Sequence, residues 1–284
     1  MFSRPVYYLS LVALIAMLVF WLLTGCARGE EEKPAPESLE ERQPAPEEHL
    51  IEASGPCQKQ VVSRVGEVSI WELPKDSTFF YEAGMAIDAD GAPQAYHPED
   101  KGLDSLSNAG QSGNWFGIVT DSGEPDGNPI IQGSDDPAPS FYVSPTSLQY
   151  DTQRPTSPLR YVDSTKIPYI ALPPEVMTED RGRLGAELGD FAVVIDIQSG
   201  QLAEAIFADV GPRGKIGEAS IALADALGVP SSPRQGFVDQ GIIYVVFPGS
   251  GNSQPRDIDE ITVEADSLFE SFGGMDQIDA CFLP

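Results

Sequence analysis

The feature that most constrains the fold is a series of short apolar runs separated by clusters of Gly, Pro, Asn, Asp and Ser. Apolar runs of about four to eight residues with such boundaries are typical of β-strands. Several runs are β-branched on both faces, as expected for strands that are covered on both sides, for instance in a small barrel. The sequence therefore predicts a mainly β domain. The expected strands are QVVSRVGEVSIWEL, WFGIV, FYVS, YIAL, DFAVVIDI, EAIFADV, GIIYVVF and ITVEA.

The sequence also predicts two helices. Residues 218–227 place Ile221 and Ala224 on one face, and Gly228 follows as a C-terminal glycine. The segment SLFESFGG near the end of the chain is the second expected helix.

The chain divides into an export segment, a tether and a folded part. Residues 1–25 combine a positive start with a long apolar run and end at LTGC, the pattern of a bacterial lipoprotein signal in which the Cys26 thiol is lipidated. The alternative is a plain transmembrane anchor, because the apolar run is about as long as a spanning helix requires. Residues 26–56, rich in Glu, Pro, Ala and Ser, are expected to be a disordered tether. The folded part, 57–284, would then be held outside the cytoplasm at a bacterial membrane. Its long Gly- and Asp-rich segment 98–157 is expected to form functional or poorly ordered loops.

Composition excludes several functions. The formal net charge is −27, with 44 acidic against 17 basic residues, which argues against nucleic-acid binding and is compatible with a cationic partner. The two histidines, His49 and His97, leave no basis for a two-histidine metal site. Cys57 and Cys281 stand at the two ends of the folded part and are expected to pair in an oxidising compartment. The alternative is two unpaired, buried thiols.

Two carboxylates surround the glycine-rich turn in FADVGPRGKIGEAS. Asp209 ends an apolar run, and Glu218 opens the first predicted helix. Cleavage of a glycosidic bond requires one carboxylic acid to protonate the leaving oxygen and one carboxylate to activate water or attack the sugar. The spacing alone leaves a second interpretation open, in which Glu218 is a helix-start acid favoured by the macrodipole and Asp209 forms a turn.

A long, ordered series of segments adds to this pattern. They are GMAIDADGAPQAYHP, GLDSLSNAG, WFGIV, IQGSDDPAPSFYVSPTSL, RYVDSTKIPYIALP, LGDFAVVID, AIFADVGPRGKIGEASIALADALG and GIIYVVFPGSG. Together they resemble the fungal-type chitosanases of glycoside hydrolase family 75. The resemblance implies endo-hydrolysis of the β-1,4 bonds of chitosan, with inversion and with no metal or other cofactor. It implies that the essential acids are Asp209 and Glu218.

The roles of the two acids follow from their expected surroundings. Glu218 is expected to be the general acid, because packing against Ile216 and Ile221 would raise its pKa. Asp209, ionised, would hold the attacking water as general base. Inversion predicts a carboxyl separation of about 6.5–9.5 Å, whereas a separation near ~5 Å would indicate a retaining route.

Further side chains are expected to bind the substrate. Asp88 and Asp90 are candidates for binding the sugar ammonium or supporting the catalytic pair. Tyr96, His97 and Trp115 are candidates for stacking on sugar rings. The alternatives are turn carboxylates that bond their own backbone and aromatic rings that belong to the core. Further acidic candidates are Asp104, Asp135 and Asp136.

The order strand, Asp, glycine turn, acid and helix also resembles the double-psi β-barrel of lytic transglycosylases and some endoglucanases. This resemblance implies a six-stranded double-psi β-barrel-like core with long loops. The first functional hypothesis is a lipid-anchored, monomeric endo-chitosanase, and the second is an enzyme acting on peptidoglycan or another amino-sugar polymer. The third is a non-catalytic glycan-binding lipoprotein, which the presence of both Asp209 and Glu218 disfavours.

Overall fold

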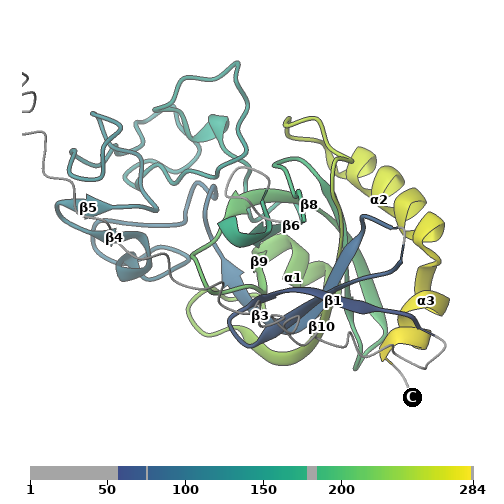
Figure 1. The fold of residues 1–284 in the computed structure, drawn as a ribbon. Helices are drawn as coiled ribbons and strands as arrows, with labels where there is room; N and C mark the ends of the chain where they lie inside the picture. The colour runs from purple at the N-terminus through teal and green to yellow at the C-terminus, as the bar shows by residue number, and fades with distance from the viewer. Residues whose placement is uncertain (1–56, 75, 178–183, 283–284) are drawn as a thin grey trace, which may run out of the picture. The chain divides into compact units, whose positions relative to one another are not determined.

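The computed structural model describes residues 57–74, 76–177 and 184–282, and within these ranges the protein is mainly β with three α-helices (Figure 1). The predicted fold class is confirmed. The predicted export segment 1–25, with Cys26, and the tether 26–56 lie outside the described residues. Within the described ranges, the helices are too short or too polar to cross a membrane.

Strand pairing closes six strands into a barrel. The sheet order is β1-β2-β3-β10-β7-β8-β6-β9, and an additional pairing of β9 with β3 joins the two ends of the last six strands. The predicted six-stranded barrel is therefore confirmed, and β1 and β2 form a hairpin that extends it. The strands are β1 (Gln60–Val65), β2 (Val68–Glu72), β3 (Phe79–Asp88), β6 (Tyr169–Leu172), β7 (Phe191–Asp196), β8 (Gln201–Val210), β9 (Glu218–Ser220) and β10 (Phe237–Phe247).

Apolar side chains from all six barrel strands fill the barrel interior. Tyr81 and Tyr244 stack at its centre with ring centroids 4.8 Å apart, and Phe79 and Phe207 are fully buried beside them. Helix α1 (Ile221–Leu227) adds its buried face to the same cluster. Each fully buried aromatic or aliphatic side chain stabilises the fold by about 1.5–3 kcal/mol, so the barrel is a packed core and a firm support for groups on its outer face.

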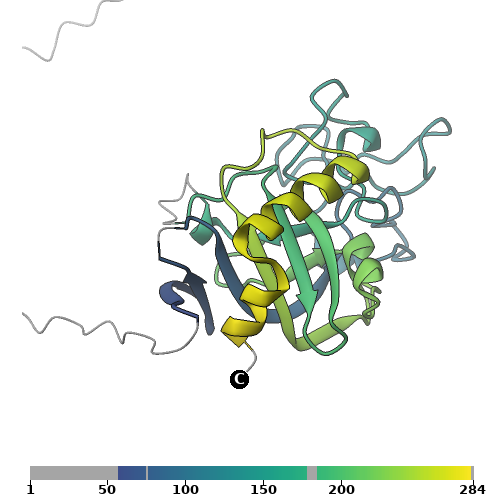
Figure 2. The ribbon, with the colours of Figure 1, turned by 90° about the vertical axis from the view of Figure 1, so that its right-hand side faces the viewer.

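Helix α2 (Ile258–Phe272) covers the outer face of β7 and β8 (Figure 2). Helix α3 (Gly274–Phe282) follows it, and its Phe282 ring packs against Trp71 of β2 and Phe80 of β3. The expected strand ITVEA is wrong, because these residues lie inside α2. Ile261, Ala265 and Phe269 recur at helical spacing and are buried against the sheet, and the Asp257 side chain caps the helix by accepting a hydrogen bond from the Glu260 amide at 2.9 Å. The expected helix SLFESFGG is the C-terminal part of α2.

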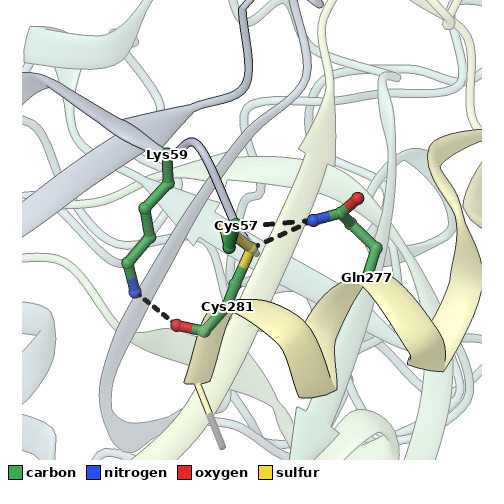
Figure 3. The surroundings of a disulfide bond; sticks show 4 residues. All are labelled: Cys57, Lys59, Gln277 and Cys281. Carbon is green, nitrogen blue, oxygen red and sulfur yellow. Dashed lines mark hydrogen bonds between the residues drawn. A yellow bond between two sulfur atoms is a disulfide. The ribbon is translucent and has the colours of Figure 1, made fainter. Parts of the chain in front are cut away.

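A disulfide joins the two ends of the described chain (Figure 3). Cys57 and Cys281 have Cα atoms 4.9 Å apart. Beside them, Lys59 Nζ donates to the Cys281 carbonyl at 2.7 Å and lies 4.4 Å from the centroid of the Trp71 ring, while Gln277 Nε2 donates to Cys281 Sγ at 3.1 Å. A cross-link that closes so long a loop stabilises a fold by about 2–5 kcal/mol.

Residues 89–165 connect β3 to β6 and are called the loop lobe below. Figure 1 shows this segment as mostly irregular chain, with β4 and β5 as short arrows. Its small core consists of Ala89, Ala92, Ala95, Tyr96, Ala109, Trp115 and Ile118. Short elements of the chain outside the barrel are η1 (Leu106–Ala109), β4 (Gly110–Gln111), β5 (Asn114–Trp115), η2 (Pro158–Arg160) and η3 (Pro174–Val176).

Two of the expected strands fall in the loop lobe and are largely absent. WFGIV overlaps β5 at its first residue, and FYVS contributes one isolated bridge between Tyr142 and Ile131. The physical reason is that these segments hydrogen-bond to single, separate loop residues, such as Val119 with Val143 and Ile130. These segments are apolar, as the sequence indicates, but they pack in the loop lobe without forming a continuous strand ladder.

Candidate active site

Strand register aligns the two expected acids across the barrel wall. Ala171 of β6 pairs with Asp209 of β8 on one side and with Glu218 of β9 on the other. Residues that pair directly on neighbouring strands point to the same face of a sheet. Because neighbouring strands lie about 4.8 Å apart, the Cα atoms of Asp209 and Glu218 are separated by roughly 10 Å, with a small alanine between them.

A bulge in the β6–β8 pairing brings Asp209 to this position. Phe207 pairs with Ile170, but the next residue of β6, Ala171, pairs with Asp209, so Ala208 is skipped. Such an extra residue re-aims the side chains that follow it, and bulges are frequent beside active sites. The bulge therefore turns Asp209 toward the face that Ala171 and Glu218 share.

Glu218 lies in β9, so the prediction that it opens a helix is wrong. Helix α1 begins at Ile221 and is capped by Ser220, whose Oγ accepts a hydrogen bond from the Leu223 amide at 3.1 Å. A serine cap satisfies the free amides of the first turn, so Glu218 is not needed there. It pairs instead with Ala86 of β3 and Ala171 of β6. The sheet, and not a helix terminus, holds the side chain in place.

Both acids line a groove of about 830 Å³ between barrel residues and loop-lobe residues. The groove also contains the predicted binding residues Asp88, Asp90 and Tyr96, together with Asp104. Asp88, Asp90 and Asp209 each place one carboxylate oxygen within 4.8 Å of the others. The structure therefore gathers most of the expected acids into one site. Its lining residues are Ala86, Ile87, Asp88, Asp90, Tyr96, Asp104, Ser107, Asn108, Phe116, Pro145, Thr146, Ser147, Gln149, Asp209, Val210, Gly211, Pro212, Lys215, Glu218, Pro233, Gly236 and Phe237.

Four of the expected residues do not line this groove. Trp115 is 9 % exposed and packs in the loop-lobe core against Tyr142. The His97 ring meets the edge of Phe141, and its Nδ1 accepts a hydrogen bond from the Glu99 amide. The remaining two are turn acids outside the groove, Asp135 and Asp136.

Hydrogen bonds from the loop lobe hold Asp209. Ser147 donates to Asp209 Oδ1 twice, through its amide at 2.8 Å and its hydroxyl at 2.7 Å. The same hydroxyl accepts a hydrogen bond from the Val210 amide at 3.1 Å. Burial raises the pKa of Asp209, and the hydrogen bonds from Ser147 oppose that shift because they favour the charged form.

The environment of Glu218 favours its protonated form up to about neutral pH. Burial, with the nearby charge of Asp209 as a second cause, raises the pKa of Glu218 to about 7, and Lys215 partly opposes the shift. The hydrogen bonds from Ser147 favour the ionised form of Asp209. The ionised form of Glu218 is favoured by the positive charge of Lys215. Two carboxylates whose surroundings separate their protonation states are suited to act as an acid–base pair.

Asp88 and Asp90 form a second acidic pair behind the first. Asp88 accepts hydrogen bonds from the Asp90 amide at 2.7 Å and from the Tyr169 hydroxyl at 3.0 Å. Asp90 accepts one from the Ser144 hydroxyl at 3.0 Å. Burial raises the pKa of both carboxyls well above the usual range, and the neighbouring acids add to the shift. A carboxyl with a raised pKa is a weaker partner for an ammonium group than one that ionises readily, so a role in supporting Asp209 and Glu218 fits these two better than amine binding.

The trio Asp88, Asp90 and Asp209 has the oxygen ligands that a hard cation such as Ca²⁺ prefers. Each carboxylate already accepts hydrogen bonds from Tyr169, Ser144 or Ser147. An ionised carboxylate has about four lone-pair sites, so these hydrogen bonds are compatible with a hydrogen-bonded acidic cluster and with a bound cation alike.

Five residues in or beside the groove were not expected from the sequence. Ser144 and Ser147 bond the acids, Lys215 acts on Glu218, and the exposed rings of Phe116 and Phe237 line the groove. Serines in a loop of mixed composition carry no signal of their own. The signal for Phe116 was its position next to Trp115 in WFGIV. In an extended segment two adjacent side chains point to opposite faces, so one of these two aromatic rings faces outward.

Comparison with known proteins covers the same part of the chain. The family model for fungal chitosanases of glycosyl hydrolase group 75 matches residues 85–273. This match runs from β3 to the end of α2 and includes every acid of the groove. No curated protein shows significant similarity to the chain.

Proposed function

The chain belongs to the fungal chitosanases of glycosyl hydrolase group 75, and on this premise we propose that it cleaves β-1,4 glucosaminide bonds within chitosan chains, with inversion. The observation that carries the proposal is the pair formed by Glu218 and Asp209. Burial raises the pKa of the Glu218 carboxyl to about 7, the Asp209 carboxyl accepts hydrogen bonds from Ser147, and both line one groove.

Glu218 acts as the general acid in this proposal. Its raised pKa, about 7, keeps the proton available at the pH of the reaction. A positioned acid of this kind donates to the glycosidic oxygen as the bond breaks and contributes a factor of about 10²–10⁴ to the rate. The departing sugar leaves as a neutral alcohol, and Glu218 becomes a carboxylate until it is reprotonated by solvent.

Asp209 acts as the general base. It takes a proton from water while the water oxygen attacks the anomeric carbon from the face opposite to the leaving group. The two donors of Ser147 support this role, because they favour the ionised carboxylate and fix its orientation. The Cα atoms of the two acids lie two strand spacings apart, and inversion requires that their carboxyl groups leave room for a water between them.

The substrate is proposed from charge and from the family. Chitosan carries one ammonium group on each deacetylated sugar, and an acidic groove on a chain of net charge −27 attracts and orients such a polymer. Asp104 is the acid proposed for an ammonium contact: it lines the groove, is not a member of the trio and is fixed by Asn108, whose Nδ2 donates to both of its oxygens at 3.0 Å. Burial raises its pKa, while hydrogen bonds from Asn108 and the Ser105 amide and the charge of Arg234 oppose the shift.

The test is reducing-end release from chitosan by the full chain, with Glu218→Gln expected to lose activity by about 10³-fold or more. Glu204→Gln is a matched control, because Glu204 lies on β8 and does not line the groove, and it should retain activity. Nuclear magnetic resonance of the first products should show the α-anomer. Unchanged turnover in Glu218→Gln, or a β-anomer, would contradict the mechanism. Release from peptidoglycan or fully acetylated chitin, but not from chitosan, would favour another amino-sugar polymer as substrate.

We further propose that Cys26 carries a lipid and holds a monomeric enzyme at the outer face of a bacterial membrane. The LTGC motif supports this proposal. The full chain, expressed in a bacterium that processes lipoproteins, should partition into the detergent phase on Triton X-114 separation. Mass spectrometry should find the unmutated chain cleaved before Cys26 and carrying a lipid, whereas Cys26→Ser should carry no lipid. An unmutated chain without a lipid on Cys26 would contradict lipidation, and light scattering of the detergent-solubilised chain would test the monomer.

A further inference from the structure

Two phenylalanines in the groove are unusually exposed for their residue type. Phe116 is 65 % exposed and Phe237 is 62 % exposed, and both line the groove that contains Asp209 and Glu218. Single exposed apolar residues are common on protein surfaces. Two large aromatic rings in one polar groove are a different case, because each leaves a flat apolar surface open beside the reacting groups.

Phe237 is held in line with the catalytic pair by the barrel. Ala86 of β3 pairs with Glu218 of β9 on one side and with Phe237 of β10 on the other. Together with the pairing of Ala171, this gives one row across the barrel wall in the order Asp209, Ala171, Glu218, Ala86, Phe237. Directly paired residues share a face, so Phe237 points to the same side as the two acids. It lies two strand spacings beyond Glu218, or roughly 10 Å between Cα atoms.

Phe116 is held by the loop lobe. Its amide donates to the Ala109 carbonyl at 3.1 Å, and the amide of Gly117 donates to the same oxygen at 3.1 Å. The preceding residue, Trp115, is buried in the lobe core. The buried ring and the paired hydrogen bonds anchor the backbone on both sides of Phe116. The exposed ring is therefore presented on a fixed support, next to the groove residue Asn108 on the same lobe.

We propose that Phe116 and Phe237 are sugar-binding platforms, each of which stacks on the apolar face of one pyranose ring of the polymer. The inference rests on the proposed function and extends it to binding. A β-linked pyranose has C–H groups on its faces and hydroxyl or amine groups around its edge, so a flat aromatic ring matches the face and leaves the polar edge to the acids. Phe237 lies on the Glu218 side of the pair, which is the side of the leaving group, so it contacts the sugar chain that departs.

Two kinds of groove residue, phenylalanines and acids, contribute to substrate binding in different ways. Stacking on C–H faces is independent of whether the amine is free or acetylated, and it depends little on salt. Contacts of the ammonium with a carboxylate weaken as salt increases. The phenylalanines therefore supply affinity for the sugar chain as such, whereas the acids supply the preference for a free amine.

The test measures binding separately from cleavage. A glucosamine hexamer is titrated into the full chain carrying Glu218→Gln, with Phe116→Ala or Phe237→Ala added. Each addition is expected to raise Kd by about 3- to 10-fold, by the same factor at low and high salt, and Phe→Tyr at either position should restore the affinity. Val263→Ala is the matched control, because Val263 is 67 % exposed on α2 and does not line the groove. It should leave Kd unchanged.

The outcomes separate this inference from the proposed function. If the unmutated chain binds the hexamer but releases no reducing ends, and the alanine variants weaken binding, the platforms stand and the hydrolase proposal fails. If the unmutated chain cleaves chitosan but neither alanine variant changes Kd or KM, the platforms are overturned and the hydrolase proposal stands. A parent chain that does not bind the hexamer at all overturns the inference as well. Circular dichroism spectra of each variant should match the parent, so that misfolding is not mistaken for lost binding.

Discussion

On the barrel wall, Asp209 and Glu218 take their positions from strand register, whereas in the loop lobe Ser144 and Ser147 take theirs from turns and single hydrogen bonds. The wall rests on a core in which Tyr81 and Tyr244 are fully buried. The lobe has a small core with few aromatic rings, and much of its backbone pairs outside regular ladders. Residues of both regions line the same groove.

The difference separates two requirements of acid–base catalysis. The reacting oxygen atoms must be held at a fixed separation, and a ladder of strands does this well. The protonation state of each carboxyl must also be set, and this needs donors that approach from outside the sheet. The lobe supplies those donors to Asp209 and Asp90, while Glu218, which receives less support from the lobe, keeps its proton.

The largest expected effect tests the wall. Asp209→Asn keeps the size of the side chain but cannot take a proton from water, so kcat on chitosan should fall by about 10³-fold while KM changes little. Asp239→Asn, at an exposed position of β10, is the matched control and should behave as the unmutated chain. A fall in kcat of less than tenfold would show that Asp209 is not the base.

The next effect tests the lobe. Ser147→Ala leaves the wall intact but removes the hydroxyl donor to Asp209, so the pKa of Asp209 should rise. Activity should then be lost at a higher pH on the acidic side of the profile, with kcat lowered by about 10- to 100-fold at the optimum. Ser147→Thr keeps the hydroxyl and should restore most of both. A pH profile that is merely scaled down, with no shift of the acidic side, would mean that Ser147 has a structural role alone.

The alkaline side of the pH–activity profile should depend instead on Glu218, which lies on the barrel wall. Glu218 must be protonated to act, and its pKa is raised to about 7. The quantity kcat/KM should therefore fall as pH rises through that value, by about tenfold for each further pH unit. Ser147→Ala should leave this side nearly unchanged. Activity that stays constant up to pH 9 would contradict the assignment of Glu218 as the acid.

The smallest effect is on stability. The folded chain holds the proton of Glu218 up to about pH 7, whereas the unfolded chain loses it near 4.5. Since the folded state binds more protons between these values, the free energy of unfolding falls as pH rises through that window. Glu218→Gln removes the penalty, so urea denaturation at pH 8 should show a gain of about 3 kcal/mol that vanishes at pH 4. Equal stabilities at both pH values would contradict the raised pKa.

Much of the barrel was predictable because strands covered on both faces have distinctive apolar runs. Strand β3 was missed, although it pairs with β2, β9 and β10. Its run is interrupted by Glu82 and Gly84. The glycine is required by close packing, since a Cβ there would lie 2.4 Å from the Val238 carbonyl. An interruption of this kind reflects a neighbouring strand that is distant in the sequence, so the local pattern cannot reveal it.

The candidate site shows the same limit. Asp209 and Glu218 were found from their residue types and the family resemblance, but the bulge at Ala208 and the pairing of both acids with Ala171 are properties of register. Adjacent aromatic residues at 115 and 116 have opposite exposures, and no periodic pattern in this loop decides which one is buried. The sequence therefore indicated the chemistry of the site, while the long-range pairing determines which side chains meet.

The disulfide between Cys57 and Cys281 has a consequence for engineering the chain. Because the Cα atoms are 4.9 Å apart, a short peptide linker could replace the sulfur bridge and make the described domain continuous from its last helix to its first strand. New ends could then be opened at the turn between β7 and β8, where residues 197–200 are exposed. Such a circularly permuted domain would keep the row of residues across the barrel wall and would fold without an oxidant, which would allow its production in a reducing cytoplasm.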